Sequence, residues 1–211
     1  MHIQLFSVNP FAENTYVLLE DNEAVIIDPG FLYPAEYEKF YNLLSSNNAS
    51  LQAILLTHAH IDHILGVQTI HNRYNVPAYL HDDDRYFWDN FQTQASMFGL
   101  EVKPFTFEPE SLRVSKNWEI GNFKFEVRHT PGHAPGHVIF YIKDEKTLIG
   151  GDTVFLESIG RTDLYKGDYH LLEKSIREQI YTLPDDTKIL PGHGPNTTVG
   201  HEKKNNPFVK S

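Results

Sequence analysis

Hydrophobic positions in the first half of the chain fall into short runs separated by polar breaks. Residues 9–13 form a turn-like break after the first run, and residues 33–44 and 64–73 carry apolar positions at helical spacing. Strands are predicted at residues 2–8, 14–20, 24–28, 51–56 and 77–80. This order predicts a hairpin of strands followed by alternating helix and strand, hence a sheet with helices on its outer face.

The second half of the chain repeats the alternation with more strands. Residues 101–110 contain two prolines and predict a loop, and residues 170–181 predict a helix. Strands are predicted at residues 112–115, 123–129, 138–142, 147–150 and 187–190. Strands, helices, strands and a final helix indicate an α/β protein, and the order is that of a duplicated αββα sandwich.

Residues 81–99 combine acidic and aromatic side chains in an unusual way. Asp82, Asp83 and Asp84 precede a stretch that contains Tyr86, Phe87, Trp88, Phe91 and Phe98. One interpretation is a helix with an acidic first turn, favoured by the helix dipole, whose aromatic side chains lie in the core. The alternative is that some aromatic side chains line the mouth of an active site and contact an apolar part of a substrate. A solvent-exposed first helical turn accounts for His81 and the three aspartates, so they are not predicted to be metal ligands.

Composition narrows the class of protein. The 211 residues suffice for one well-buried domain or two small ones, and the net charge of −10 argues against a nucleic-acid partner. There is no cysteine, which excludes disulfides, thiolate nucleophiles and thiolate metal ligands. The first residues have no basic and apolar segments of a signal peptide, and no run reaches the length of a membrane span. We therefore expect a cytoplasmic protein with no membrane partner.

The densest group of metal-binding side chains is the segment 57–63. His58 and His60 alternate after a predicted buried strand, so their side chains can project to the same side, and Asp62 and His63 follow directly. The segment lies at the carboxyl end of a strand, where open α/β sheets place ligands. Imidazoles and a carboxylate at this density suit a transition metal better than a merely polar loop.

Three further candidates lie far away in the sequence. His133 ends a Thr-Pro-Gly-His segment, Asp152 follows two glycines after a strand, and His193 lies between two glycines. Taken alone, Asp152 would be interpreted as a cap or turn residue. His129 and His137 flank His133 at a spacing of four, but proline and glycine exclude a helix there, and both are predicted to be structural or to support the ligands by hydrogen bonds.

These motifs together resemble those of the metallo-β-lactamase superfamily, and within it most closely the short glyoxalase II-like hydrolases. The residues that carry the resemblance are His58-Ala59-His60-Ile61-Asp62-His63, His133, Asp152 and His193. The resemblance implies a four-layer αββα sandwich. It also implies a single domain over residues 1–211, without the helical C-terminal domain of full-length glyoxalase II.

The resemblance further implies two divalent ions, with zinc expected and iron or manganese as chemically plausible alternatives. His58, His60 and His133 would bind the first ion, Asp62, His63 and His193 the second, and Asp152 would bridge them. Asp28, which closes the third strand, would support this site by hydrogen bonds to ligands. Its other interpretation is a turn residue bound to its own backbone.

The implied activity is hydrolysis of a small-molecule thioester such as S-lactoylglutathione through a metal-bound hydroxide. Asp62, Asp152 and Arg161 are the candidate catalytic residues, with Arg161 either binding a substrate carboxylate or forming a surface contact with Asp163. The missing helical domain predicts weak dependence on the glutathione moiety. The alternatives are a persulfide dioxygenase with one iron at His58, His133 and Asp152, and a lactone or ester hydrolase of the same fold. A monomer or a small homo-oligomer is expected.

Overall fold

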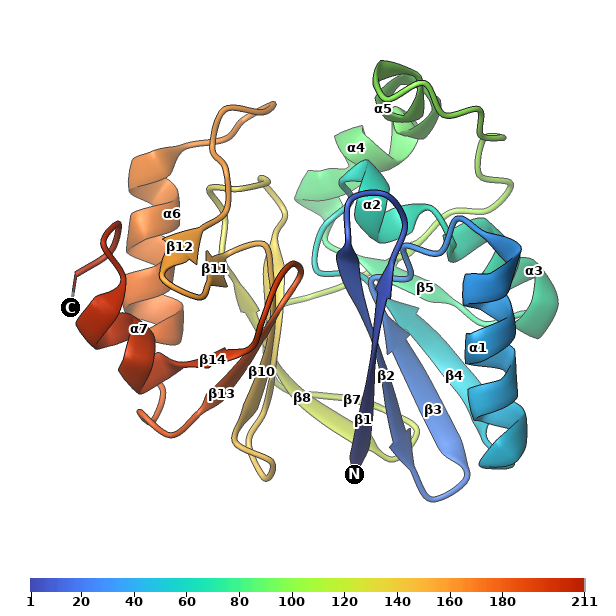
Figure 1. Ribbon diagram of the computed structural model, residues 1–211, viewed down its shortest axis with the longest axis horizontal. Coiled ribbons are helices and arrows are strands. Elements are labelled where there is room, and N and C mark those ends of the chain that lie inside the picture. The colour runs from blue at the N-terminus through green and yellow to red at the C-terminus, as the bar shows by residue number, and fades with distance from the viewer. Residues whose placement is uncertain (211) are drawn as a thin grey trace. The chain divides into compact units, whose positions relative to one another are not determined.

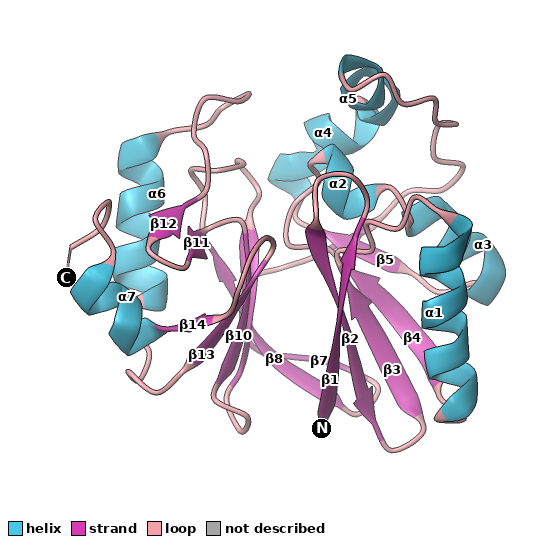
Figure 2. Ribbon diagram, in the orientation of Figure 1, coloured by secondary structure: helices cyan, strands magenta, loops and turns pink. Residues whose placement is uncertain are grey.

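The computed structural model describes residues 1–210, and its backbone contacts divide them into two compact units. Unit 1 comprises residues 1–112 and 120–123. Unit 2 comprises residues 113–119 and the described chain from residue 124 onward. Each unit contains one six-stranded sheet with helices beside it (Figures 1 and 2). No helix within the described residues is both long and apolar enough to span a bilayer.

The sheet of unit 1 follows chain order, β1-β2-β3-β4-β5-β6. The first three strands pair antiparallel and the later ones parallel. Its strands are β1 (His2–Val8), β2 (Glu13–Glu20), β3 (Glu23–Ile27), β4 (Ser50–Leu55), β5 (Ala78–Leu80) and β6 (Glu110–Ser111). Its helices are α1 (Pro34–Ser46), α2 (Ile61–Ile64), α3 (Val67–Tyr74), η1 (Asp82–Asp84), α4 (Arg85–Asp89) and α5 (Phe91–Met97).

The parallel pairing of β3 with β4 determines which residues meet at the end of this sheet. Ile27 lies opposite Leu55, and the backbone N–H of Asp28 donates to the Leu55 carbonyl at 3.0 Å. The residues that follow β3 and those that follow β4 therefore lie side by side. Asp28 comes directly after β3, and Thr57 comes shortly after β4. The strand register thus places the Asp28 carboxylate next to the histidine-rich segment.

Glu36 fixes the start of α1. Its carboxylate accepts the backbone N–H groups of Leu32 (2.7 Å) and Tyr33 (2.9 Å), while Pro34 occupies the first turn, where its missing N–H is not needed. The same carboxylate accepts the N–H of Asn9 at 2.7 Å. One acidic side chain thus begins the helix and ties it to the β1–β2 turn.

The sheet of unit 2 has the order β14-β13-β10-β9-β8-β7, with β10 and β13 parallel. It comprises β7 (Ser115–Ile120), β8 (Phe123–His129), β9 (Val138–Ile142), β10 (Thr147–Gly151), β13 (Lys188–Pro191) and β14 (Thr197–Thr198). A separate hairpin is formed by β11 (Val154–Phe155) and β12 (Ser158–Ile159). The helical elements are α6 (Tyr169–Ser175), η2 (Ile176–Ile180) and α7 (Val199–Asn205).

A continuous apolar core joins these helices to their sheet. Leu172 of α6 and Ile176 of η2 are fully buried among Ile139, Leu148 and Ile189 of the strands. Asp168 begins α6 by accepting the N–H of Leu171 at 2.9 Å, a normal N-cap bond. The cap and the apolar stripe set this helix against the sheet of unit 2.

Several predicted elements differ from the structure. The strand predicted at 112–115 is wrong: residues 112–114 are irregular, and the strand there is β7, which was missed because its exposed side chains hide the alternation. The helix predicted at 64–73 begins earlier, as α2, and restarts as α3. Residues 81–99 form η1, α4 and α5 with a break at Asn90. Residues 170–181 pass from α6 into one π-helical turn, and α7 was not predicted.

Truncating the core side of α6 should destabilise the protein far more than truncating its outer side. Leu172 is 0% exposed and its neighbour Leu171 is 39% exposed. We expect Leu172→Ala to lower the free energy of unfolding by about 2–5 kcal/mol and Leu171→Ala by less than about 1 kcal/mol. Urea unfolding followed by circular dichroism measures both, and equal losses would contradict the packing described for this helix.

Candidate functional site

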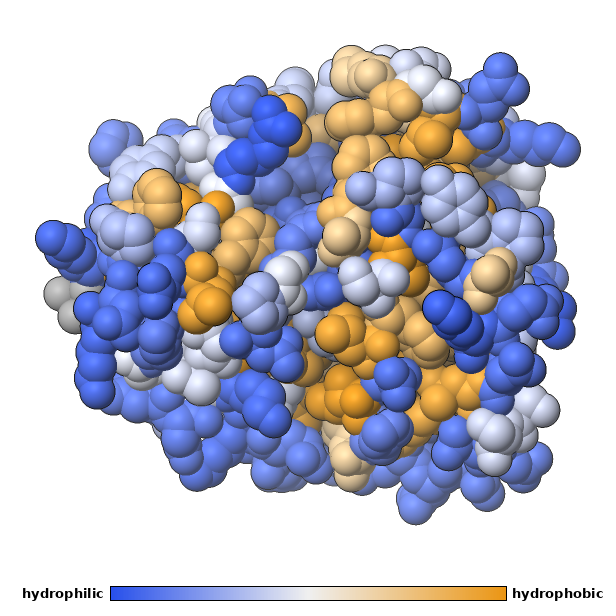
Figure 3. Space-filling view, in the orientation of Figure 1, coloured by the Kyte–Doolittle hydropathy of each residue, from blue (hydrophilic) through white to orange (hydrophobic). Residues whose placement is uncertain are grey.

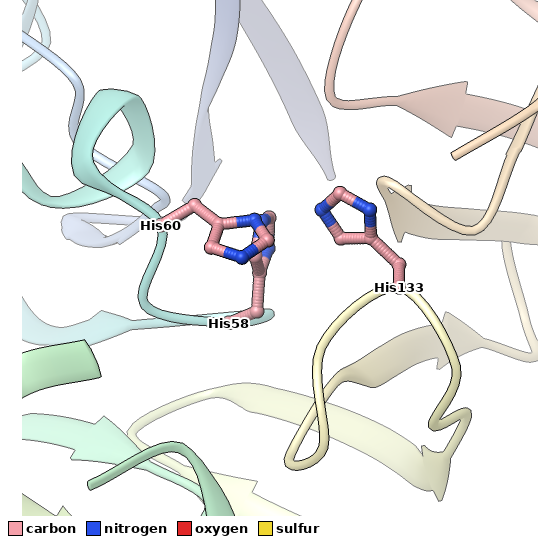
Figure 4. A group of neighbouring side chains, drawn as sticks. All are labelled: His58, His60 and His133. Atoms are coloured by element: carbon pink, nitrogen blue, oxygen red, sulfur yellow. The ribbon is translucent and has the colours of Figure 1, made fainter. Parts of the chain in front are cut away.

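The histidine-rich segment of unit 1 lies in the loop between β4 and α2. His58, His60 and His63 are 0%, 6% and 0% exposed, so all three rings are buried although the segment is strongly polar. The ring centroid of His58 lies 4.7 Å from that of His60 and 4.2 Å from that of His63. Figure 4 shows the rings of His58 and His60 gathered at this loop. The structure therefore brings these three predicted ligands together.

Asp28, which the resemblance predicts to support the site, forms hydrogen bonds to this segment. Its carboxylate accepts the N–H of Thr57 at 2.7 Å and the Thr57 hydroxyl at 2.5 Å, and it lies 3.1 Å from Nδ1 of His63. Its φ of 50° is left-handed, a conformation that aspartate tolerates better than most residues. The side chain thus bonds to the histidine segment, in contrast to the alternative of a turn residue bound to its own backbone.

These bonds assign the ring protons of two histidines. An ionised carboxylate only accepts, so Nδ1 of His63 donates to Asp28. The Thr57 hydroxyl has one hydrogen, which goes to Asp28, and it therefore accepts from Nδ1 of His58 at 3.0 Å. In the neutral form each ring then has its lone pair on Nε2, the state in which imidazole binds a metal.

Glu13, the last residue of the turn predicted at residues 9–13, is a buried acidic residue beside this group. It begins β2, is 0% exposed, accepts the Thr15 hydroxyl at 2.7 Å and lies 3.7 Å from Nδ1 of His63. Burial raises the pKa of Glu13 well above its ordinary value. The run from Tyr16 to Leu19 indicated that β2 is buried, but nothing in the sequence indicated that the strand begins with a buried acid.

The predicted ligands of unit 2 gather around Asp152. His133 lies in the loop after β8 (Figure 4), Asp152 follows β10, and His193 follows β13. Oδ2 of Asp152 lies 3.5 Å from Nε2 of His133 and 3.6 Å from Nε2 of His193. The parallel pairing of β10 and β13 brings the ends of those strands together, so three segments converge on one carboxylate.

Close backbone packing holds the His133 loop and the Asp152 loop in place. Nδ1 of His133 lies 2.8 Å from the carbonyl oxygen of Arg161, an acceptor that fixes the ring proton on Nδ1. A Cβ at Gly160 would lie 1.9 Å from the carbonyl oxygen of Asp152 and 3.0 Å from Nδ1 of His133. A Cβ at Gly132, whose φ is 131°, would lie 2.3 Å from the backbone nitrogen of Leu172. Glycine is therefore required at both positions.

His137 and His129 hold the backbone of this loop region. Nε2 of His137 accepts the backbone N–H of Asp152 at 3.0 Å, and its Nδ1 lies 3.0 Å from the Thr130 hydroxyl. Nε2 of His129 lies 2.8 Å from the carbonyl oxygen of Pro135. These bonds are structural, as predicted, and the bond from His137 orients the residue that carries the central carboxylate.

Arg161 is on the surface, with 59% of its side chain exposed. Its guanidinium makes two bonds of 2.7 Å to the carboxylate of Asp163, which lowers the pKa of Asp163 to about 2. This is the surface contact that the sequence analysis gave as one interpretation of Arg161. The contribution of this residue to His133 comes from its backbone carbonyl, which the sequence did not indicate.

The donor spacing within each unit suits divalent metal ions. Asp62 and His63 approach to 3.7 Å in unit 1, and the two Asp152 pairs are 3.5 and 3.6 Å long. These distances exceed good hydrogen bonds of about 2.7–3.2 Å. Two ligands about 2.1 Å from a tetrahedral zinc ion are separated by roughly 3.4 Å. Nitrogen and oxygen donors at this spacing therefore fit zinc, and the same set accepts iron or manganese.

The aromatic segment of unit 1 divides between core and surface. Phe87, Trp88 and Phe91 are buried, whereas Tyr86 is 45% exposed and Phe98 is 55% exposed. Figure 3 shows hydrophobic atoms gathered at the surface over α5. The ring of Phe87 lies edge-on against His60, with centroids 4.5 Å apart. The core interpretation is confirmed for Phe87, Trp88 and Phe91, and an aromatic lining of an active-site mouth stays a prediction.

Comparison with known proteins gives matches over most of the chain. The sequence model of the Metallo-beta-lactamase superfamily matches residues 8–193, a span that includes all the predicted ligands. A relative from Haemophilus influenzae, "Hydroxyacylglutathione hydrolase GloC", is 34% identical over 214 residues, which cover 100% of this chain and 99% of that protein. The match therefore extends over nearly the full length of both proteins.

Two solved structures share the fold at appreciable sequence identity. "BLEG-1 B3 metallo-beta-lactamase" is 39% identical with a TM-score of 0.88, covering 100% of both chains. "TTHA1623 in a di-iron-bound form" is 34% identical with a TM-score of 0.87, covering 98% of this chain and 100% of that one. The predicted α/β fold of the metallo-β-lactamase type is thereby confirmed.

Adding a methyl group at Gly160 should displace the Asp152 and His133 backbones and weaken metal binding. We expect Gly160→Ala to lower metal affinity about 10- to 100-fold, the usual effect of losing the support of a ligand. Ser158→Ala, two residues earlier in β12, is the control. Metal per chain after dialysis against a graded chelator measures the effect, with circular dichroism to establish folding. Full metal retention in folded Gly160→Ala would contradict the importance of this close approach.

Proposed function

Because the chain belongs to the metallo-β-lactamase superfamily and is a metallohydrolase of that fold, we propose that it hydrolyses small thioesters, S-lactoylglutathione among them. The observation that carries this proposal is the complete set of donors, seven residues that match the motifs of dinuclear hydrolases. The full-length similarity to a hydroxyacylglutathione hydrolase supports the thioester as the bond that is cleaved.

The proposed centre holds two divalent ions. His58, His60 and His133 would hold one ion, Asp62, His63 and His193 would hold the other, and Asp152 would be shared by both. Zinc is the proposed metal because the donors are nitrogen and oxygen atoms with tetrahedral spacing. TTHA1623 has been solved with two irons, so iron is the alternative to test in this chain.

Bound divalent ions would supply an activated water as nucleophile and would stabilise the negative charge that develops on the carbonyl oxygen. The residues of this chain prepare the centre for that task. Asp28 and Thr57 accept the Nδ1 protons of His63 and His58, and the carbonyl of Arg161 accepts that of His133, so in the neutral rings Nε2 is the atom that would bind a metal. The proposal needs no protein nucleophile, in agreement with a chain that has no cysteine.

Arg161 is proposed to contact a carboxylate of the substrate. Its guanidinium is bound by the Asp163 carboxylate through two hydrogen bonds. A substrate carboxylate would displace Asp163 and accept the same two hydrogen bonds. The contribution of Arg161 would then be to substrate binding, at the cost of releasing Asp163.

Hydrolysis of a β-lactam ring is a second candidate function. The 39% identity to a protein described as a B3 metallo-β-lactamase favours it, and an amide and a thioester can both be attacked by the same activated water. The persulfide dioxygenase alternative would use only His58, His133 and Asp152, and would leave Asp62, His63 and His193 without a role.

We expect the zinc-loaded protein to hydrolyse S-lactoylglutathione. A short acyl thioester should be hydrolysed with a kcat/KM within about 100-fold of the kcat/KM for S-lactoylglutathione. Activity should disappear on chelation and fall below about pH 7, where the attacking water is protonated. Measuring kcat/KM for both thioesters, a lactone and a chromogenic β-lactam decides the substrate class. A β-lactam preferred over every thioester would contradict the proposal. So would oxygen consumption with glutathione persulfide by an iron-loaded protein that leaves thioesters intact.

A further inference from the structure

The segment from η1 to α5 holds the backbone of Ala59, the residue between His58 and His60. The N–H of Ala59 donates to Oδ2 of Asp84 at 2.8 Å. The carbonyl of Ala59 accepts from Nε2 of Gln94 at 3.0 Å. Both polar backbone groups of one residue are therefore bound by side chains from a segment that follows it by 25 and 35 positions.

Burial makes these two bonds necessary. Ala59 is 0% exposed, so its N–H and carbonyl need partners inside the protein. The strand β4 has already ended at Leu55, and α2 begins only at Ile61. Neither a sheet nor a helix therefore supplies the partners at Ala59, and the side chains of Asp84 and Gln94 do.

The geometry of Gln94 uses both hydrogens of its amide. One is donated to the carbonyl of Ala59, and the other to the carbonyl of Phe87 at 2.8 Å. The ring of Phe87 in turn lies edge-on against His60 at 4.5 Å between centroids. Gln94 thus fixes the position of α4 relative to the histidine loop. It thereby positions the Phe87 ring against which His60 packs.

We propose that Asp84 and Gln94 are positioning residues that set the backbone at Ala59 and so the convergence of the His58 and His60 rings on one metal ion. The inference rests on the proposed function in so far as it takes these two histidines as ligands. It gives the segment from η1 to α5 a role in preparing the metal centre in addition to its role in the core. A metal ion would bind more tightly to a loop that is already held in its binding conformation.

Gln94→Glu is the sharpest test. Glutamate has the same size, but its carboxylate accepts only, so it loses both donated bonds and faces two carbonyl oxygens. We expect zinc affinity, measured by competition with a chromogenic chelator, to fall about 10- to 100-fold. The visible absorption of the cobalt-loaded protein should change as well, because it reports ligand geometry. Gln94→Ala should show a smaller loss, and it replaces Gln94→Glu if the latter does not fold.

Two further comparisons separate positioning from mere structural support. Gln92→Ala is the matched control, since Gln92 lies in the same helix and bonds to the carbonyl of Val102 at 3.3 Å. Asp84→Asn keeps an acceptor for the Ala59 N–H and should retain more zinc affinity than Asp84→Ala. A structural role alone would lower the melting temperature of the metal-free protein while leaving zinc affinity and the cobalt spectrum of the folded protein unchanged, and that result would overturn the proposal.

Failure of the inference can be distinguished from failure of the proposed function. His58→Ala and His60→Ala should each abolish tight zinc binding at one of the two sites. If they do so while folded Gln94 variants bind zinc as the wild type does, only the positioning role is overturned. If neither histidine variant changes zinc binding, the ligand assignment is wrong, and the positioning role is overturned with it.

Discussion

The bond between Asp28 and the histidine segment is the interaction on which the described site depends. A loop with three histidines is buried in unit 1, and buried imidazoles need defined partners. Asp28 provides them directly for His63 and through Thr57 for His58. The parallel register of β3 and β4 places that carboxylate beside the loop. Fold and ring protonation are therefore linked by one side chain at the end of one strand.

In unit 2 the candidate ligands are oriented by a backbone carbonyl and a histidine ring, where unit 1 uses a carboxylate. The carbonyl of Arg161 orients His133, and the ring of His137 orients the backbone of Asp152. The cost is steric, since the segments come so close that Gly160 cannot carry a Cβ. Asp28 in unit 1 accepts hydrogen bonds from two neighbours, and Gly160 in unit 2 permits a close approach of two backbone segments. Both features hold Nε2 and carboxylate oxygen atoms in fixed directions.

The sequence predicted the parts of this arrangement that are local. His58, His60, Asp62 and His63 are recognisable because a metal motif lies in one loop, and the buried strands are recognisable from their apolar runs. The sequence did not predict Glu13, Asp84 or Gln94, whose partners lie in other segments of the chain. It also misplaced β7, whose side chains are mostly exposed, and missed the break at Asn90. Contacts between distant segments decide these features, and no local pattern encodes them.

The central proposal is that the seven donors hold two ions, and titration of the metal-free protein tests it most directly. Zinc would be added in steps while bound metal and S-lactoylglutathione hydrolysis are both followed. The account predicts that binding saturates at two zinc ions per chain and that activity reaches its plateau with the second. Saturation of both binding and activity at one ion per chain, or undiminished hydrolysis by the metal-free protein, would contradict it.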